Sequence, residues 1–182
     1  MTKSYHHGEL REALIAAGAA ALEETGNTDI SLRETARRAG VSPTATYRHF
    51  ASKEALLAAI AGRGFCDLEQ RFTKAQGDLT GFGHAYISFA RDRPAMFRLM
   101  FGGAYSISTL SEDERKVGHD AYSTLIKAVA QSLDLPVDDP KVLHHAVNTW
   151  SLVHGYAMLL LDDRLPDAAQ SDGFLAKMLK RN

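Results

Sequence analysis

The spacing of apolar residues constrains this chain most, because it is helical almost from end to end. Along the 182 residues, apolar side chains recur at intervals of three and four. That period places them on one face of an α-helix. No segment shows the period-two alternation of a strand–turn–strand unit. The sequence therefore predicts an all-α protein with about nine helices.

Capping and turn residues mark the helix ends in the N-terminal part of the chain. A first helix is expected over about residues 8–25, and Gly26 supplies the left-handed position that ends it. Ser31 and Glu34 have the spacing of a capping box, in which hydroxyl and carboxylate both satisfy free backbone N–H groups. This second helix is expected to stop at Gly40, which can adopt the positive φ of a turn.

A third, short helix follows the glycine turn directly. Ser42 is expected to cap it, and Pro43 stands at the first helical position, where its missing N–H costs nothing. Ser52 then caps a long fourth helix. Two short helices joined by a glycine turn predict a helix-turn-helix between Ser31 and Lys53.

The rest of the chain is predicted to form a larger helical domain. Glycines 77, 81 and 83 are expected to form a joint after the fourth helix. Further helices are expected at about 82–93, 94–101, 112–133, 140–162 and 168–181, with prolines between them. The predicted domains are residues 1–70, a small N-terminal three-helix helix-turn-helix module, and residues 71–182, a C-terminal helical domain.

Positive charge is concentrated in the helix-turn-helix. The net charge of the chain is −1, yet five basic residues and one acidic residue lie between Arg33 and Lys53. From residue 71 onward, 13 basic residues balance 13 acidic ones. A local basic patch fits a protein that touches phosphates with one end. The near-neutral total argues against an architectural DNA binder, which relies on many phosphate contacts.

Motifs for enzymes and metal sites are missing from the sequence. Cys66 is the single cysteine, so neither an internal disulfide nor a cysteine-based zinc site is expected. His144 and His145 are adjacent and would point about 100° apart on a helix, a poor arrangement for shared metal ligation. The chain has no H-E-x-x-H, nucleophile elbow or phosphate-cradling loop. We predict a protein that is not an enzyme and has no cofactor.

The N-terminus and the hydropathy predict a cytoplasmic protein. The first residues are polar and lack the apolar core of a signal peptide. The longest apolar stretches are far shorter than a membrane span.

Residues 5–70 resemble the DNA-binding domain of TetR-type transcriptional repressors. The resemblance lies in GELREALIAAGAAALEETG and SLRETARRAGVSPTATYRHFASKEALLAAI. Three motifs fall at the family's spacings: Gly40-Val41-Ser42, Tyr47-x-His49-Phe50 and Ser52-Lys53-Glu54-x-Leu56-Leu57.

This resemblance implies DNA-contacting roles for individual positions. Tyr47, His49 and Lys53 match phosphate-binding positions, and Lys53 also lies at a helix N-terminus, itself an anion site. Arg48 matches the base-facing surface, where it would contact guanine bidentately or, alternatively, hold a phosphate. The full predicted set is Arg33, Ser42, Thr44, Ala45, Thr46, Tyr47, Arg48, His49 and Lys53. Arg37 and Arg38 are expected to be exposed charges.

The C-terminal domain is rich in aromatic and methionine side chains, which line pockets for apolar or aromatic ligands. A core without a cavity is the alternative for each residue, and the family resemblance favours the pocket. Candidate lining residues are Tyr86, Phe89, Phe97, Met100, Phe101, Tyr105, His119, Tyr122, Trp150 and His154.

The string W-x-x-x-H-G, formed by Trp150, His154 and Gly155, resembles the regulatory domain of one TetR branch, together with the segment RPAMFRLMF. A structural role remains open, with His154 bonding in the core and Gly155 allowing close helix contact.

The helix at 140–162 predicts a homodimer because it is apolar on two sides. One stripe contains Leu143, Val147, Trp150, Ala157 and Leu161. The other, joined by the last helix, is assigned to the partner and contains Ala146, Val153, Tyr156, Leu160, Leu175, Met178 and Leu179. Two-fold symmetry would place two recognition helices about one DNA turn apart, matching a palindromic operator.

These features predict a repressor that a small apolar or aromatic ligand releases from its operator. The ligand would act by changing the distance or angle between the two DNA-binding domains of the dimer. The alternative is an activator, or a ligand-independent regulator of the same fold.

Overall fold

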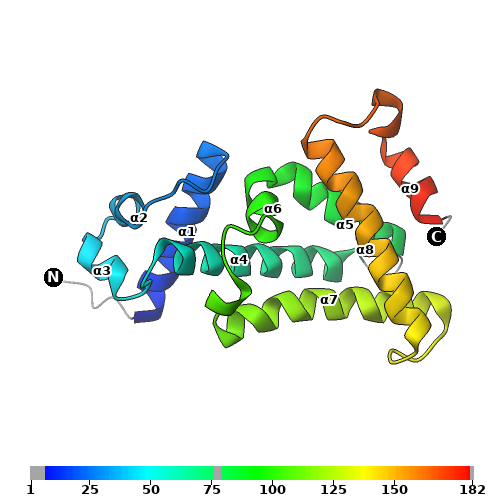
Figure 1. The fold of residues 1–182 in the computed structure, drawn as a ribbon, viewed down its shortest axis with the longest axis horizontal. Coiled ribbons are helices and arrows are strands. Elements are labelled where there is room, and N and C mark those ends of the chain that lie inside the picture. The colour runs from blue at the N-terminus through cyan, green and yellow to red at the C-terminus, as the bar shows by residue number, and fades with distance from the viewer. Residues whose placement is uncertain (1–6, 76–78, 181–182) are drawn as a thin grey trace. The chain divides into compact units, whose positions relative to one another are not determined.

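A computed structural model describes residues 7–75 and 79–180, and over these ranges the chain forms nine α-helices and no strand (Figure 1). The helices are α1 (His7–Thr25), α2 (Leu32–Arg38), α3 (Pro43–Tyr47), α4 (Lys53–Lys74), α5 (Leu79–Asp92), α6 (Pro94–Phe101), α7 (Glu112–Leu133), α8 (Pro140–Leu161) and α9 (Asp172–Lys180). Two 3₁₀ turns, η1 (Ile107–Thr109) and η2 (Asp167–Ala169), complete the fold. The predicted all-α class is confirmed.

The chain divides into two compact units. The first contains the described residues up to Phe65 together with Arg93–Lys116, and the second contains Cys66–Asp92 and the described residues from Val117 onward. The predicted boundary after residue 70 lies near the break at Phe65. Sequence reasoning did not anticipate that residues 93–116, which include α6, belong with the helix-turn-helix.

In the first unit, α1 packs against α2 and α6, and α2 packs against α3. Gly18 allows α1 to lie close to α4, because a Cβ at this position would be only 2.6 Å from Ile60 Cδ1. The largest fully buried side chains of this unit are Leu14, Leu22, Leu56, Ile60, Met96, Phe97 and Leu99. These side chains form the core that supports the helix-turn-helix.

In the second unit, α5 packs against α8 and α9. A cluster of buried side chains joins α7 to α8: Leu125, Val129, Ala130, Val142 and Ala146. Asp139 caps α8 by accepting the Lys141 backbone N–H at 2.8 Å, and Pro140 follows at the first helical position. The short connection and the cap set α7 and α8 as a hairpin.

The predicted glycine joint is wrong where the structure describes it. Gly81 and Gly83 lie inside α5, and a Cβ on Gly83 would overlap with Leu179. Gly83 therefore serves close packing of α5 on α9, whereas Gly77 lies outside the described residues. The last helix also begins later than predicted, because η2 precedes it. Among the described helices, none has the length and apolarity of a membrane span.

Candidate nucleic-acid interface

The helix-turn-helix is fixed by backbone capping. Ser31 Oγ accepts the Glu34 N–H at 3.0 Å at the start of α2, and Ser42 Oγ accepts the Ala45 N–H at 3.2 Å at the start of α3. Between them, Gly40 adopts a φ of 69°, which favours glycine. The Val41 N–H closes the turn on the Ala36 carbonyl at 3.0 Å. These bonds set the angle between the two short helices.

Most of the predicted DNA-contacting residues lie on the surface of this unit. Ala45 and His49 are half-buried. The exposed residues are Arg33, Ser42, Thr44, Tyr47, Arg48 and Lys53. Their contacts with DNA remain a prediction.

The structure corrects the assignment of Thr46. Its side chain is 0% exposed, so it packs inside the unit and is not available to DNA. Its hydroxyl has no hydrogen-bond partner among the described residues. The motif spacing suggested a contact position, but helical periodicity turns Thr46 inward from the exposed Tyr47.

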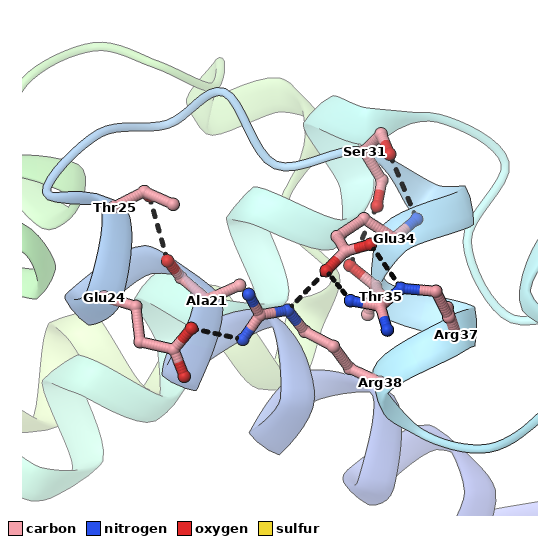
Figure 2. A network of polar contacts seen from close by, with 8 residues as sticks. All are labelled: Ala21, Glu24, Thr25, Ser31, Glu34, Thr35, Arg37 and Arg38. Carbon is pink, nitrogen blue, oxygen red and sulfur yellow. Dashed lines mark hydrogen bonds and ion pairs between the residues drawn. The ribbon is translucent and has the colours of Figure 1, made fainter.

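Glu34 departs from the predicted capping box. Ser31 caps the helix as expected, but the Glu34 carboxylate turns to two arginines, as Figure 2 shows. Arg37 donates to both carboxylate oxygens, at 2.8 Å and 2.7 Å, and Arg38 Nε donates at 2.7 Å. The bonds from Arg37, and then from Arg38, lower the pKa of Glu34 to about 2. The box is therefore only half formed.

Two further acidic residues pair with the basic patch. Arg38 also donates to Glu24 of α1 at 2.6 Å, which ties α2 to α1 (Figure 2). Lys53 Nζ lies 3.5 Å from Asp29 Oδ1, and both side chains are exposed. Neighbouring carboxylates thus offset part of the basic excess counted in the sequence.

Acidic side chains attach residues 93–116 to the rest of the first unit. Glu23 Oε1 accepts the Arg93 Nε–H at 2.9 Å and the Met96 backbone N–H at 3.3 Å, capping α6 from α1. Arg11 donates to Glu114 at 2.8 Å. These partners lie 70 or more residues apart, and no local sequence signal could have revealed them.

In the second unit, three of the predicted pocket residues share one hydrogen-bond network. Tyr86 Oη lies 2.9 Å from His154 Nδ1, and Trp150 Nε1 donates to the same hydroxyl at 3.3 Å. The indole N–H donates to the phenol oxygen, and the phenol donates to His154 when Nδ1 carries no proton. Burial raises the pKa of Tyr86 and lowers that of His154. The neutral forms of both groups suit this network.

The four-residue spacing of Trp150 and His154 brings both side chains to Tyr86 from one face of α8. Tyr122 of α7 extends the cluster, with its ring centroid 5.7 Å from that of Trp150. Gly155 is different, because it is exposed and nothing lies within 4 Å of a Cβ at this position. The predicted close helix contact at Gly155 is therefore wrong.

The other predicted pocket residues are divided between the units. Phe97, Met100, Phe101 and Tyr105 belong to the first unit, and Phe89 and His119 belong to the second. Phe89 and Phe97 are fully buried, whereas His119 is exposed. A pocket lined by the whole set remains a prediction.

The predicted dimer face is corrected. Five of its residues are buried within the chain itself: Ala146, Val153, Tyr156, Leu175 and Leu179. Leu160 and Met178 are half-buried. Tyr156 even donates its hydroxyl to the Ala169 carbonyl at 2.7 Å. In the other stripe of α8, Leu143, Val147 and Trp150 are exposed at 55%, 46% and 38%, whereas Ala157 is fully buried and Leu161 is half-buried.

Two family models match most of this chain. The model for tetR-family bacterial regulatory proteins matches residues 14–60, and the model for the tetracyclin repressor-like C-terminal domain matches residues 79–181. An uncharacterized HTH-type transcriptional regulator of Bacillus subtilis (strain 168), YobS, is 23% identical over 162 residues, covering 84% of this chain and 80% of YobS.

Solved structures share the fold of this chain. A protein of unknown function from Rhodococcus sp. RHA1 has a TM-score of 0.79 at 29% identity, covering 99% of this chain and 96% of its own. A tetR-family transcriptional regulator from Streptomyces coelicolor has a TM-score of 0.72 at 25% identity, covering 96% and 80%. With both of its domains matched, this chain belongs to the TetR family of transcriptional regulators.

Proposed function

We propose that this protein is a homodimeric repressor that binds a palindromic operator and is released by a small apolar or aromatic ligand. The observation that carries the proposal is the exposed polar surface of α3 and its neighbours. Tyr47, Arg48 and Lys53 are exposed around a backbone that two serine caps hold in place. Short side chains such as Thr44 would let α3 approach the major groove closely.

We assign the dimer interface to the exposed part of the other stripe of α8, from Leu143 to Trp150. Leu143, Val147 and Trp150 lie four and three residues apart and so form one face. A homodimer that covers this face would remove three large apolar side chains from water. A Val147→Asp variant is expected to be monomeric in sedimentation velocity, and dimers at the wild-type affinity would contradict the assignment.

Operator binding is tested by fluorescence anisotropy with the DNA upstream of the protein's own gene. Tyr47→Ala and Lys53→Ala should weaken binding to all sequences, because both remove phosphate contacts. Arg48→Ala should also relax the preference at one base pair. Arg164→Ala, exposed in the second unit, is the control that should leave binding unchanged. Specific binding retained by all three test variants would contradict the proposal.

The fluorescence of Trp150 can report ligand binding, because Trp150 is the only tryptophan in the chain. A ligand that binds near Tyr86 and His154 should change its fluorescence and lower operator affinity over the same concentration range. Compounds that change the fluorescence without affecting the operator complex would contradict release by this site. Trp150→Phe provides the matched signal control.

A further inference from the structure

The charges on α2 are arranged so that one carboxylate occupies two guanidinium groups. Arg37 holds Glu34 through two nitrogens, and Arg38 uses its Nε on the same carboxylate (Figure 2). A bidentate arginine–carboxylate pair is the strongest common form of such a contact. Within the described part of the chain, the Glu34 carboxylate contacts only these two side chains.

Arg37 shares an exposed face of α2 with a proposed DNA contact. It follows Arg33 by four residues, so the two side chains share a face of α2 one turn apart. Arg33 is exposed and is proposed to contact DNA, and the side chain of Arg37 is 72% exposed. Arg38 differs because its second bond, to Glu24, fastens α2 to α1.

Phosphate contacts by lysine and arginine supply the affinity of a protein for DNA of any sequence. A guanidinium already paired with a carboxylate gains little from a phosphate, since the phosphate must displace that carboxylate and is repelled by it. Among the described residues, Arg33 and Arg48 make no ion pair with an acidic side chain. The helix-turn-helix therefore presents fewer available cations than its sequence contains.

We propose that Glu34 is a specificity-determining residue that withholds Arg37 from the DNA backbone and so limits sequence-independent binding. The inference rests on the proposed binding of DNA by the helix-turn-helix. It gives Glu34 a role that helix capping does not supply, since Ser31 alone caps α2. Discrimination is then left to Arg33 and the exposed residues of α3, which face the operator.

The test measures binding of the full-length protein to a random-sequence DNA duplex by anisotropy over a range of salt concentrations. Glu34→Gln should tighten binding and steepen the salt dependence by about 0.9 in log–log slope for each additional phosphate that the protein neutralises. The ratio of affinities at about 50 mM and about 200 mM salt should then rise roughly 3.5-fold for each such phosphate. Arg37→Ala alone should keep the wild-type slope, and Glu34→Gln/Arg37→Ala should return to it.

Glu24→Gln is the matched control, because Arg38 keeps its bond to Glu34 and the slope should not change. A lower slope in Arg37→Ala alone would overturn the proposal, because Arg37 would then already hold a phosphate. The proposal would also be overturned if Glu34→Gln, with the thermal stability of the wild type, bound the random-sequence duplex no more tightly than the wild type does. If the wild-type protein binds neither this duplex nor its own upstream DNA, the proposed function fails and the inference fails with it. If the wild-type protein binds DNA but Glu34→Gln does not steepen the salt dependence, only the inference is overturned.

Discussion

Two buried hydroxyl groups, one in each unit, have opposite surroundings. Thr46, in the helix-turn-helix, is fully buried and its hydroxyl has no partner among the described residues. Tyr86, in the second unit, is buried with its hydroxyl bonded to both His154 and Trp150. The contrast shows that the second unit pairs its buried hydroxyl with side chains of another helix, while the buried hydroxyl of α3 contributes no such bond among the described residues.

The two units also differ in the length of the helices concerned. α2 and α3 have seven and five residues, too few to form stable helices alone, so serine caps and tertiary packing define them. α5 and α8 have 14 and 22 residues, and polar side chains in their interiors can select one packing of helix on helix. Substitutions in each unit test this division.

The largest effect is expected from removing the Tyr86 hydroxyl. Tyr86→Phe leaves the Trp150 N–H and His154 Nδ1 without this partner, and we expect a loss of about 1–3 kcal/mol in the free energy of unfolding. Urea denaturation measures it. Tyr47→Phe, at an exposed position, should change stability by less than about 0.5 kcal/mol. Equal effects of the two substitutions would show that the network does not stabilise the second unit.

The next effect concerns the cap of α3. Ser42→Ala removes the oxygen that accepts the Ala45 N–H, and the expected loss is about 1 kcal/mol. Ser151→Ala, at an exposed position inside α8, should instead be neutral or slightly stabilising because alanine favours helices. Urea unfolding midpoints of both variants check this pair. An unfolding midpoint of Ser42→Ala equal to that of the wild type would mean that packing, without the serine cap, holds α3.

A smaller effect of opposite sign is expected at Thr46. Thr46→Val keeps the shape and deletes the unpartnered hydroxyl, so the free energy of unfolding should rise by up to about 1 kcal/mol. Thr35→Val is the matched control on α2, because the Thr35 hydroxyl donates to the Ser31 carbonyl at 3.0 Å. That variant should lose stability. Destabilisation by both substitutions would indicate that the Thr46 hydroxyl does have a partner in solution.

The helix-turn-helix was predictable because its signals are local. Ser31, Gly40, Ser42 and Pro43 act on backbone atoms within four residues of themselves, so their positions in the sequence state what they do. Glu34 shows the limit of such reasoning. Its spacing fits a capping box, but Arg37 and Arg38 lie on the same side of the helix and offer charged donors. A charged partner is preferred over a backbone N–H.

The buried stripe of α8 could not be identified from sequence because both stripes are apolar. Which stripe is buried depends on tertiary packing, including that of α5 on α8, and α5 is distant from α8 in the sequence. The partners of Glu23 could not be predicted for the same reason. Contacts between helices far apart in the sequence depend on the complete fold, which periodicity does not describe.

The smallest effect tests the network through pH. Burial lowers the pKa of His154 below its ordinary value of 6.5, so between these two values the unfolded chain binds a proton that the folded chain does not. Stability must therefore rise with pH up to about 6.5 and then level off, and it must fall on acidification. A proton on Nδ1 would also prevent His154 from accepting the Tyr86 hydroxyl.

Replacing His154 isolates this contribution, because the other seven of the eight histidines are common to both proteins. His154→Gln keeps a hydrogen-bond acceptor but does not titrate, so the fall in its urea midpoint from about pH 7 to about pH 5 should be smaller than that of the wild type. His119→Gln, at an exposed position, should retain the wild-type dependence. Parallel curves for the wild type and His154→Gln would mean that His154 titrates alike in the folded and unfolded chains. The bond between the Tyr86 hydroxyl and His154 would then contribute nothing to the pH dependence of stability.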